Sequence, residues 1–219
     1  MMCARFSLAG PDRIADRYPQ FKLPRSWPPR YNIAPTQDVL AARAGEAELR
    51  PLRWGLVPAW ARDAAAGQTL INARVETLAE KPAFRDALQR RRCAVFADGF
   101  FEWSGAKRRR QPYRFTVDGG VPFAFAGLWE RWGPSGTALE SCTIVTCVPN
   151  ALCASVHDRM PAILDDAALE TWLHGDTADA LAAIAPFDAA RMQTVAVTPA
   201  MNHHAFDEPR AIEPLSALF

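Results

Sequence analysis

The stretch Cys93-Ala-Val-Phe-Ala-Asp-Gly-Phe-Phe-Glu-Trp103 decides the fold class. It predicts a buried strand that ends in an Asp-Gly turn, followed by an aromatic-rich strand at 100–103. Further strands are predicted at 3–8, 37–42, 48–54, 112–117, 122–129, 141–147 and 193–198, and helices at 11–18, 82–91, 165–174 and 177–184. Because strands and helices do not alternate regularly, a doubly wound parallel sheet is disfavoured. We therefore expect a single α+β domain over residues 1–219 with an antiparallel, curved sheet.

The composition is that of an ordinary globular protein. Hydrophobic residues make up 49% of the 219 residues and charged residues 22%, which excludes a disordered, collagen-like or low-complexity chain. No stretch approaches the roughly 20 apolar residues of a membrane span. The N-terminus has no long apolar run of the kind found in signal peptides. We expect a cytoplasmic protein without a membrane partner.

A net charge of +1 conceals a strong asymmetry along the chain. Residues 1–114 hold 21 Lys and Arg against 11 Asp and Glu, a net +10, whereas residues 115–219 hold 4 against 13, a net −9. Basic clusters occur at 90–92 and at 107–110. This asymmetry indicates a polyanionic partner, although each cluster alone also fits a solvated helix end or hairpin tip.

Five cysteines occur without CxxC spacing, so the sequence predicts no zinc site, no other metal and no cofactor. Four of them are expected to be small apolar core residues in a reduced compartment. Cys3 is different, because removal of the preceding Met residues would expose an α-amine with a pKa of roughly 7.7–8.0 beside a thiol of roughly 8.5. Such a 1,2-aminothiol condenses with an aldehyde to an imine, which the thiol closes to a thiazolidine ring.

Three further segments carry candidate chemistry. Asn72, Arg74 and Glu76 alternate with apolar residues and share one face in an extended conformation, as they would in any amphipathic surface strand. Glu102 stands among aromatic residues, which raise the pKa of a carboxyl group and suit a general acid or base, unless it faces solvent. His157 precedes Arg159 by two residues, so both lie on one side if the segment is extended.

Two Pro-rich segments combine basic and aromatic residues and are predicted to be loops. They are Arg30-Tyr-Asn-Ile-Ala-Pro-Thr36 and Arg53-Trp-Gly-Leu-Val-Pro-Ala-Trp60. Loops of this composition suit the stacking of unpaired bases together with phosphate contacts. A set of core aromatic residues is the alternative interpretation.

The ordered set of these motifs resembles the SOS-response-associated peptidase (SRAP) domain over nearly the whole chain. The motifs are Cys3-Ala-Arg-Phe, Arg30-Tyr-Asn-Ile-Ala-Pro, Arg53-Trp-Gly-Leu-Val-Pro, Asn72-Ala-Arg-Val-Glu-Thr, Asp98-Gly-Phe-Phe-Glu-Trp and His157-Asp-Arg-Met-Pro. The resemblance implies an α+β domain with a barrel-like β core flanked by short helices. It also implies covalent capture of abasic sites in single-stranded DNA, and hence a cytoplasmic, nucleoid-associated protein.

The resemblance also implies a role for each matching residue. Cys3 is the nucleophile that forms a thiazolidine with the ring-opened sugar, and Asn72 holds the lesion. Glu102 shuttles protons, and His157 assists opening of the deoxyribose. The DNA-binding residues implied are Arg5, Asn32, Pro35, Trp60, Arg74, Trp103 and Arg159, with Arg74 and Arg159 as phosphate clamps.

The N-terminus departs from the family pattern Met-Cys-Gly-Arg-Phe, because the chain begins Met1-Met2-Cys3-Ala4. A retained Met leaves Cys3 without a free α-amine. Three alternatives follow: either translation starts at Met2, or the protein trims itself with help from Glu102, or this N-terminus is inactive. An N-terminal-Cys peptidase or amidohydrolase and a non-covalent single-stranded DNA binder are the alternative functions. We expect a monomer.

Overall fold

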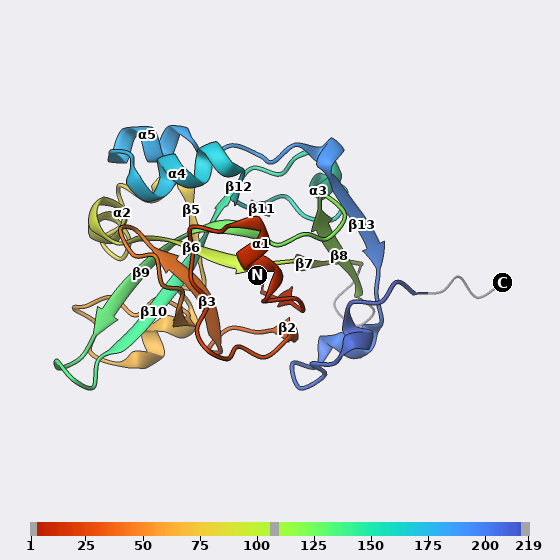
Figure 1. Cartoon of the computed structure of the whole chain (residues 1–219), viewed down its shortest axis with the longest axis horizontal. Helices are drawn as coiled ribbons and strands as arrows, with labels where there is room; N and C mark the ends of the chain where they lie inside the picture. Colours follow the sequence, from red (N-terminus) through yellow and green to blue (C-terminus); the bar gives the residue numbers. More distant parts are fainter. Residues whose placement is uncertain (1–3, 106–109, 216–219) are drawn as a thin grey trace.

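A ring of five hydrogen-bonded strands in the order β10–β4–β3–β6–β9 forms the core, and it closes because β9 also pairs with β10 (Figure 1). The computed structural model describes residues 4–105 and 110–215. The ring strands are β3 Asp38–Arg43, β4 Arg50–Trp54, β6 Arg92–Ala97, β9 Phe123–Trp132 and β10 Leu139–Cys147. Every contact in the ring is antiparallel except β4–β10. The predicted α+β class with a barrel-like antiparallel core is confirmed.

Three short strands extend the ring. They are β5 Asn72–Arg74, β11 Met160–Pro161 and β12 Ile163–Leu164. β5 runs parallel to β10 and places Arg74 opposite Thr146, while β11 places Pro161 opposite the same Thr146 from the other side. Segments that lie more than 80 positions apart in the sequence are thereby separated by a single strand.

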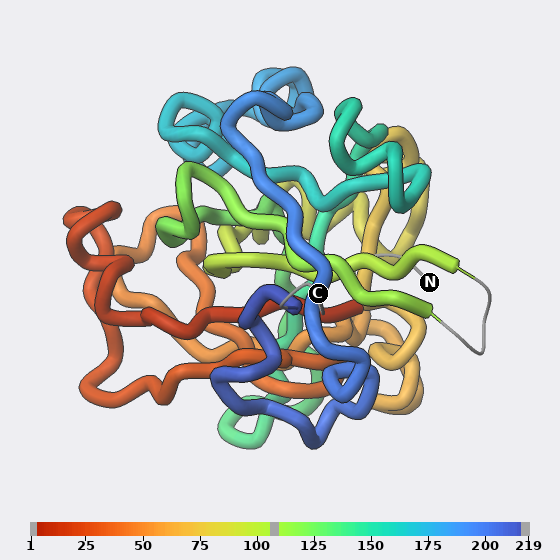
Figure 2. Tube along the Cα trace, turned by 90° about the vertical axis from the view of Figure 1, so that its right-hand side faces the viewer, coloured from red at the N-terminus to blue at the C-terminus, as the bar shows by residue number. Residues whose placement is uncertain are grey.

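A second, antiparallel sheet has the order β13–β8–β7–β1–β2. Its strands are β1 Phe6–Leu8, β2 Arg30–Ile33, β7 Gly99–Ser104, β8 Gln111–Val117 and β13 Met192–Ala196. Figure 2 shows β13 and the C-terminal segment on the near side of this sheet. Phe6 pairs with Phe100, and the Phe101 N–H donates to the Arg5 carbonyl at 3.0 Å. The described chain therefore begins, at Ala4, beside β7 close to Glu102.

Aromatic residues from both sheets meet in one core. The Phe6 ring lies 5.1 Å from Trp54 and 5.7 Å from Phe125, and Phe100 stacks on Phe115 at 5.0 Å. All six residues of β6 are buried, as its apolar part, residues 93–97, predicts. Arg92 is the exception: its cluster was expected at a solvated helix end or against a polyanion, but its guanidinium is buried and donates to the carbonyls of Leu88, Trp172 and Gly175. The four described cysteines, at 93, 142, 147 and 153, are free and buried, also as predicted.

Short helices flank the strands. The α-helices are α1 Arg13–Arg17, α2 Arg85–Arg90, α3 Ala151–Ala154, α4 Asp166–His174 and α5 Thr177–Ala182. The 3-10 helices are η1 Ala64–Gln68, η2 Val75–Thr77, η3 Ala189–Arg191, η4 Pro199–Asn202 and η5 Pro209–Ala211. Asp165 caps α4 by accepting from the Ala168 N–H at 2.8 Å, and the Trp172 indole of α4 donates to the Cys93 carbonyl of β6 at 2.9 Å. Within the described ranges, no helix has the length and apolarity needed to cross a membrane.

Two local predictions are wrong. The segment 30–36 was expected to be a loop, but its first half forms strand β2, because it pairs with β1. Asp207 accepts from the backbone N–H groups of Tyr31 and Asn32 in this strand. The segment around 72–77 is extended only over β5 and then turns into η2, so Glu76 does not continue the face formed by Asn72 and Arg74. In both cases a partner far along the chain outweighs the local pattern.

Candidate nucleic-acid site

Four of the predicted site residues line one open pocket of about 390 Å³. Asn72 and Arg74 come from β5, whereas His157 and Arg159 come from the loop between α3 and β11. The rest of the lining is Thr69, Ile71 and Asp158. The two segments meet here because β5 and β11 both pair with the end of β10.

His157 is held from two sides by backbone groups. Its N–H donates to the Cys153 carbonyl at 2.9 Å, and its Nδ1 accepts from the Arg159 N–H at 3.2 Å. Burial lowers the pKa of His157, the negative charge of Asp158 opposes this shift, and the positive charge of Arg110 adds to it. Nδ1 also lies 2.9 Å from the carboxylate of the exposed Asp158. The loop is not extended, so the predicted pairing of His157 with Arg159 on one strand face is wrong.

Arg159 is buried and its guanidinium is already engaged. Nη1 and Nη2 each bond to a carboxylate oxygen of Glu76, and Nη2 also donates to the Thr146 carbonyl at 2.8 Å. The hydrogen bond from Arg159 holds the pKa of the Glu76 carboxyl below its usual range. In contrast, Arg74 is exposed. The two arginines, both predicted as phosphate clamps, therefore have different surroundings.

Glu102 lies on β7, opposite Tyr113 of β8, and only 3% of it is exposed. Glu102 is close to Cys153 of α3. The pKa of the Cys153 thiol is raised to about 12, first by burial and next by the negative charge of Glu102. The carbonyl of this Cys153 accepts from the His157 N–H. Glu102 and His157 thus both lie near the same short helix.

Arg5, Asn32 and Trp103 contact the C-terminal segment. Asn32 is fully buried, and its Nδ2 lies within hydrogen-bonding distance of three carbonyls, those of Met201, His203 and Phe206. Arg5 donates to the Asn32 side-chain oxygen at 2.9 Å. The Trp103 indole donates to the Asn202 side-chain oxygen at 2.6 Å. A contact from Asn32 to DNA would require this buried network to break.

The other predicted residues lie outside the pocket lining. Trp60 is 68% exposed, which suits base stacking, and Pro35 is half-buried in the turn after β2. Cys3 and the basic positions 107–109 lie outside the described residues. Sequence reasoning did not single out Arg110 individually, although its cluster was noted, and it missed Asn202 altogether, since nothing near that position signals its contact with Trp103.

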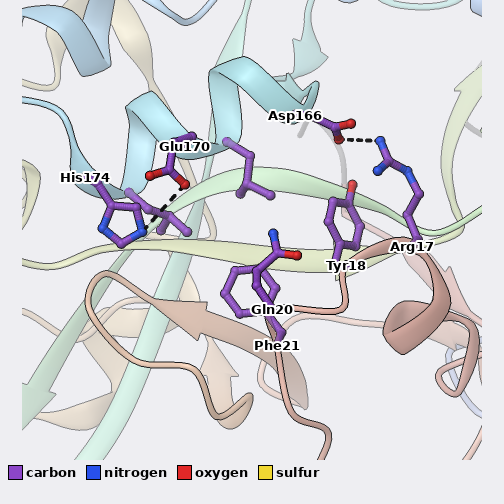
Figure 3. A pocket seen from close by; sticks show the side chains of 9 residues that line it. Arg17, Tyr18, Gln20, Phe21, Asp166, Glu170 and His174 are labelled. Carbon is purple, nitrogen blue, oxygen red and sulfur yellow. Dashed lines mark hydrogen bonds and ion pairs between the residues drawn. The ribbon is translucent and has the colours of Figure 1, made fainter.

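A separate pocket of about 280 Å³ lies between the segment 17–21 and helix α4 (Figure 3). Leu169 and Leu173 are among its lining residues. Two ion pairs also belong to the lining, one between Arg17 and Asp166 and one between His174 and Glu170 at 4.0 Å. None of the sequence-predicted site residues lines it. No group of His, Cys, Asp and Glu that could hold a metal ion occurs in the described part of the chain.

Comparison with known proteins agrees with the fold. Residues 2–204 match the family SOS response associated peptidase (SRAP). The chain is 39% identical over 222 residues to the abasic site processing protein YoqW of Bacillus subtilis (strain 168), covering 97% of this chain and 99% of YoqW. It is 30% identical over 247 residues to the abasic site processing protein HMCES of Mus musculus, covering 92% of this chain and 69% of HMCES. A solved structure of a Bacteroides thetaiotaomicron protein matches with a TM-score of 0.86 at 25% identity, covering 97% of this chain and 99% of that one.

Fold and pocket define an α+β barrel protein in which residues from distant segments converge at one end of β10. The chain belongs to the SRAP family.

Replacing the exposed Arg74 with Ala should weaken binding of single-stranded DNA and make it less dependent on salt. Each lost phosphate contact lowers the slope of log K against log salt by about 0.7 for a single strand. Fluorescence anisotropy with an oligonucleotide that contains a tetrahydrofuran abasic analogue, which has no aldehyde, measures this slope without covalent reaction. The control is Arg131→Ala, an exposed arginine of β9 at the opposite end of β10. An unchanged slope for Arg74→Ala would contradict the assignment.

Proposed function

We propose that this protein captures abasic sites in single-stranded DNA by a covalent thiazolidine between Cys3 and the ring-opened deoxyribose aldehyde. The observation that carries the proposal is the convergence of Asn72 and His157 on one pocket, with Glu102 reaching the same helix α3. The family, and the relatives named abasic site processing proteins, support the same substrate.

The reaction needs only the amine and thiol of Cys3 and the aldehyde of the sugar, and it requires no further reactant. The α-amine of Cys3 adds to the aldehyde carbon, and the resulting carbinolamine loses water to give an imine. The Cys3 sulfur then adds to the imine carbon, and its proton passes to the nitrogen, so that the net change is the loss of one water. Proton transfers accompany the loss of water and the ring closure, and Glu102 is the group that we assign to them.

The sugar must open before it reacts, because a free aldehyde is present only in the open form. Opening the hemiacetal requires a proton on the ring oxygen and removal of one from the hydroxyl group. The His157 ring lines the pocket, and we assign it to exchange a proton with the sugar during this opening. Asn72 supplies an amide that holds the sugar while it opens.

Basic groups near the pocket supply the attraction for the strand. Arg74 lines the pocket, and Arg110 lies close enough to affect the pKa of His157. The exposed Trp60 offers a surface on which an unpaired base stacks. These features favour single-stranded DNA as the partner, because a base that stacks on the protein has left its duplex.

A denaturing gel with an abasic-site oligonucleotide tests the proposal. Wild type, Cys3→Ala and a protein whose translation starts at Met2 are run side by side, and intact mass reports the N-terminus of each. The expected result is a shifted band that survives denaturation, that is absent for Cys3→Ala and whose mass is protein plus oligonucleotide less one water.

Other outcomes separate the alternatives. If only the protein starting at Met2 shifts, the additional Met blocks the amine, and capture through Cys3 is still confirmed. If a protein with a verified free Cys3 amine gives no band, covalent capture is wrong. Equal DNA binding by wild type and Cys3→Ala without any adduct would then favour a non-covalent binder, whereas cleavage of added peptides would favour a peptidase.

A further inference from the structure

We propose that the C-terminal segment, residues 199–211, positions Cys3 for the reaction, and that Arg5 and Asp207 are the positioning residues through which it acts. The inference rests on the proposed function, because the reaction that it serves is covalent capture through Cys3. It gives a role to Asp207, which none of the sequence motifs contains. Figure 2 shows this segment crossing in front of the N-terminal strand.

The reaction needs a firm hold on the start of the chain. Once the preceding Met residues are removed, Cys3 is a terminal residue, and terminal residues fray unless they are tied down. Strand β1 begins only at Phe6, and the Phe101 N–H donates to the Arg5 carbonyl at 3.0 Å just before it. The amine and the thiol must both reach one carbon atom of the sugar, and a small misplacement slows such a step strongly. A side-chain anchor close to Cys3 would therefore speed capture.

The Arg5 side chain provides such an anchor two residues from Cys3. Its Nη1 donates to the Asn32 side-chain oxygen at 2.9 Å and to the Met201 carbonyl at 3.1 Å. Its Nη2 donates to the Asn202 carbonyl at 3.3 Å. The two carbonyls belong to η4 in the C-terminal segment, so the guanidinium ties the N-terminal strand to that segment. A planar fork holds several acceptors at once, which the point charge of an ammonium group does not.

Asp207 fixes the C-terminal segment on β2. Its carboxylate pairs with the Arg30 guanidinium and accepts from the N–H groups of Tyr31 at 2.5 Å and Asn32 at 2.8 Å. Only 21% of the Asp207 side chain is exposed. A carboxylate repels a phosphate, so Asp207 does not act on capture by holding the DNA backbone. Any loss of capture on its replacement is transmitted through the segment.

Apolar packing joins the C-terminal segment to β7 in a small cluster separate from the main core. The buried members of this cluster are Phe101, Val197, Met201 and Ala211. On the same strand, the Trp103 indole donates to the Asn202 side-chain oxygen at 2.6 Å. Phe101 and Trp103 flank Glu102 in the sequence. The segment that anchors Arg5 therefore also holds the strand that carries the proposed proton shuttle.

The test compares the capture rates of Asp207→Asn and Arg5→Lys with that of the wild type, each with a free Cys3 amine verified by intact mass. Asp207→Asn keeps the shape of the side chain but loses the charge that pairs with Arg30, and Arg5→Lys keeps the charge but loses the fork. At saturating abasic-site strand we expect each variant to capture about 10- to 100-fold more slowly than the wild type.

Asp118→Asn is the matched control. Asp118 also accepts two hydrogen bonds from one arginine, Arg191, at 3.0 and 2.6 Å, but this pair is on the surface of the opposite end of β8. Its loss should leave the capture rate within about twofold of the wild type, since exposed pairs contribute little.

Two further measurements separate positioning from binding and from reactivity. The affinity for the tetrahydrofuran strand should not fall in Asp207→Asn or Arg5→Lys, because neither change removes a positive charge. The rate at which glyoxylate, a small aldehyde, forms a thiazolidine with Cys3 should also match the wild type, because a small reagent reaches the amine and the thiol wherever they lie. Only the rate with the strand depends on the position of Cys3.

Hydrogen exchange reports the hold on the N-terminal strand without any reaction. The Phe101 amide donates to the Arg5 carbonyl, so its exchange should become faster when Arg5 is released. We expect faster exchange in Asp207→Asn and Arg5→Lys and wild-type exchange in Asp118→Asn.

The proposal is overturned if both variants capture the strand at the wild-type rate, or if their affinity for the tetrahydrofuran strand falls in parallel with capture. It is equally overturned if the glyoxylate rate falls as much as the capture rate. Should Arg5→Lys fail to fold, Asp207→Asn carries the test. If the wild type reacts with glyoxylate but not with the abasic-site strand, the proposed function fails, whereas Phe101 exchange still decides whether the C-terminal segment holds the N-terminal strand.

Discussion

Replacement of Glu102 with Gln is expected to slow covalent capture by about 10²- to 10⁴-fold, the usual contribution of a general acid or base. Gln has nearly the same shape and keeps an acceptor oxygen, but it cannot take up and return a proton. Glu102 is almost fully buried on β7 and opposite Tyr113, so an isosteric change leaves the sheet intact. The rate is measured by quenching samples over time and quantifying the denaturation-resistant band.

A matched variant separates catalysis from burial of a carboxylate. Glu130 is also buried, but it pairs with Arg91 on the surface of the ring, on strand β9. Glu130→Gln should leave the capture rate within about threefold of the wild type, since Glu130 lies opposite Ser141, away from the end of β10 that borders the pocket. Binding of the tetrahydrofuran strand by Glu102→Gln should be nearly unchanged. A capture rate for Glu102→Gln equal to that of Glu130→Gln would remove Glu102 from the mechanism.

Replacement of Asp98 with Ala is expected to lower the free energy of unfolding by about 3–5 kcal/mol, the usual cost of leaving a buried charge without its partner. Asp98 is 3% exposed and accepts from the Ser7 hydroxyl at 2.7 Å, from Arg114 at 3.0 Å and from the Gly10 N–H at 3.2 Å. It thereby ties β1 and β8 to the turn between β6 and β7. Urea denaturation followed by tryptophan fluorescence measures the change.

An exposed ion pair supplies the control for Asp98. Arg50 pairs with Glu46 at 2.8 Å, but its side chain is 49% exposed. Arg50→Ala should therefore cost only about 0–1 kcal/mol. If Asp98→Ala costs no more than Arg50→Ala, the buried network does not hold the two sheets together.

The Asp98-Gly99 turn shows how a local signal and a distant contact coincide. The dipeptide was readable as a turn from its residue types alone. The structure adds a second reason for Gly99, because a Cβ there would lie 2.6 Å from the Arg114 Nε. The turn was therefore predictable, whereas the arginine that packs across it comes from another strand.

Sequence motifs selected residues that the fold brings together, but they did not predict the contacts of those residues. Asn72, Arg74 and His157 were selected by motif, and they do line one pocket. The engagement of Arg159 by Glu76 was missed, because the two are 83 positions apart and each was interpreted as part of its own strand face. Likewise, the burial of Asn32 depends on the carbonyls of a segment about 170 residues later.

The sequence by itself determined most of the longer strands, the α+β class and the candidate residues. Alternating and continuous apolar runs specify strands locally, and Gly, Pro and Asp specify the turns between them. Only the tertiary structure decided which of two similar arginines faces solvent and which backbone groups hold His157. The physical reason is that hydrogen-bond partners and burial depend on which segments β10 brings together, and strand pairing is not encoded in any one stretch.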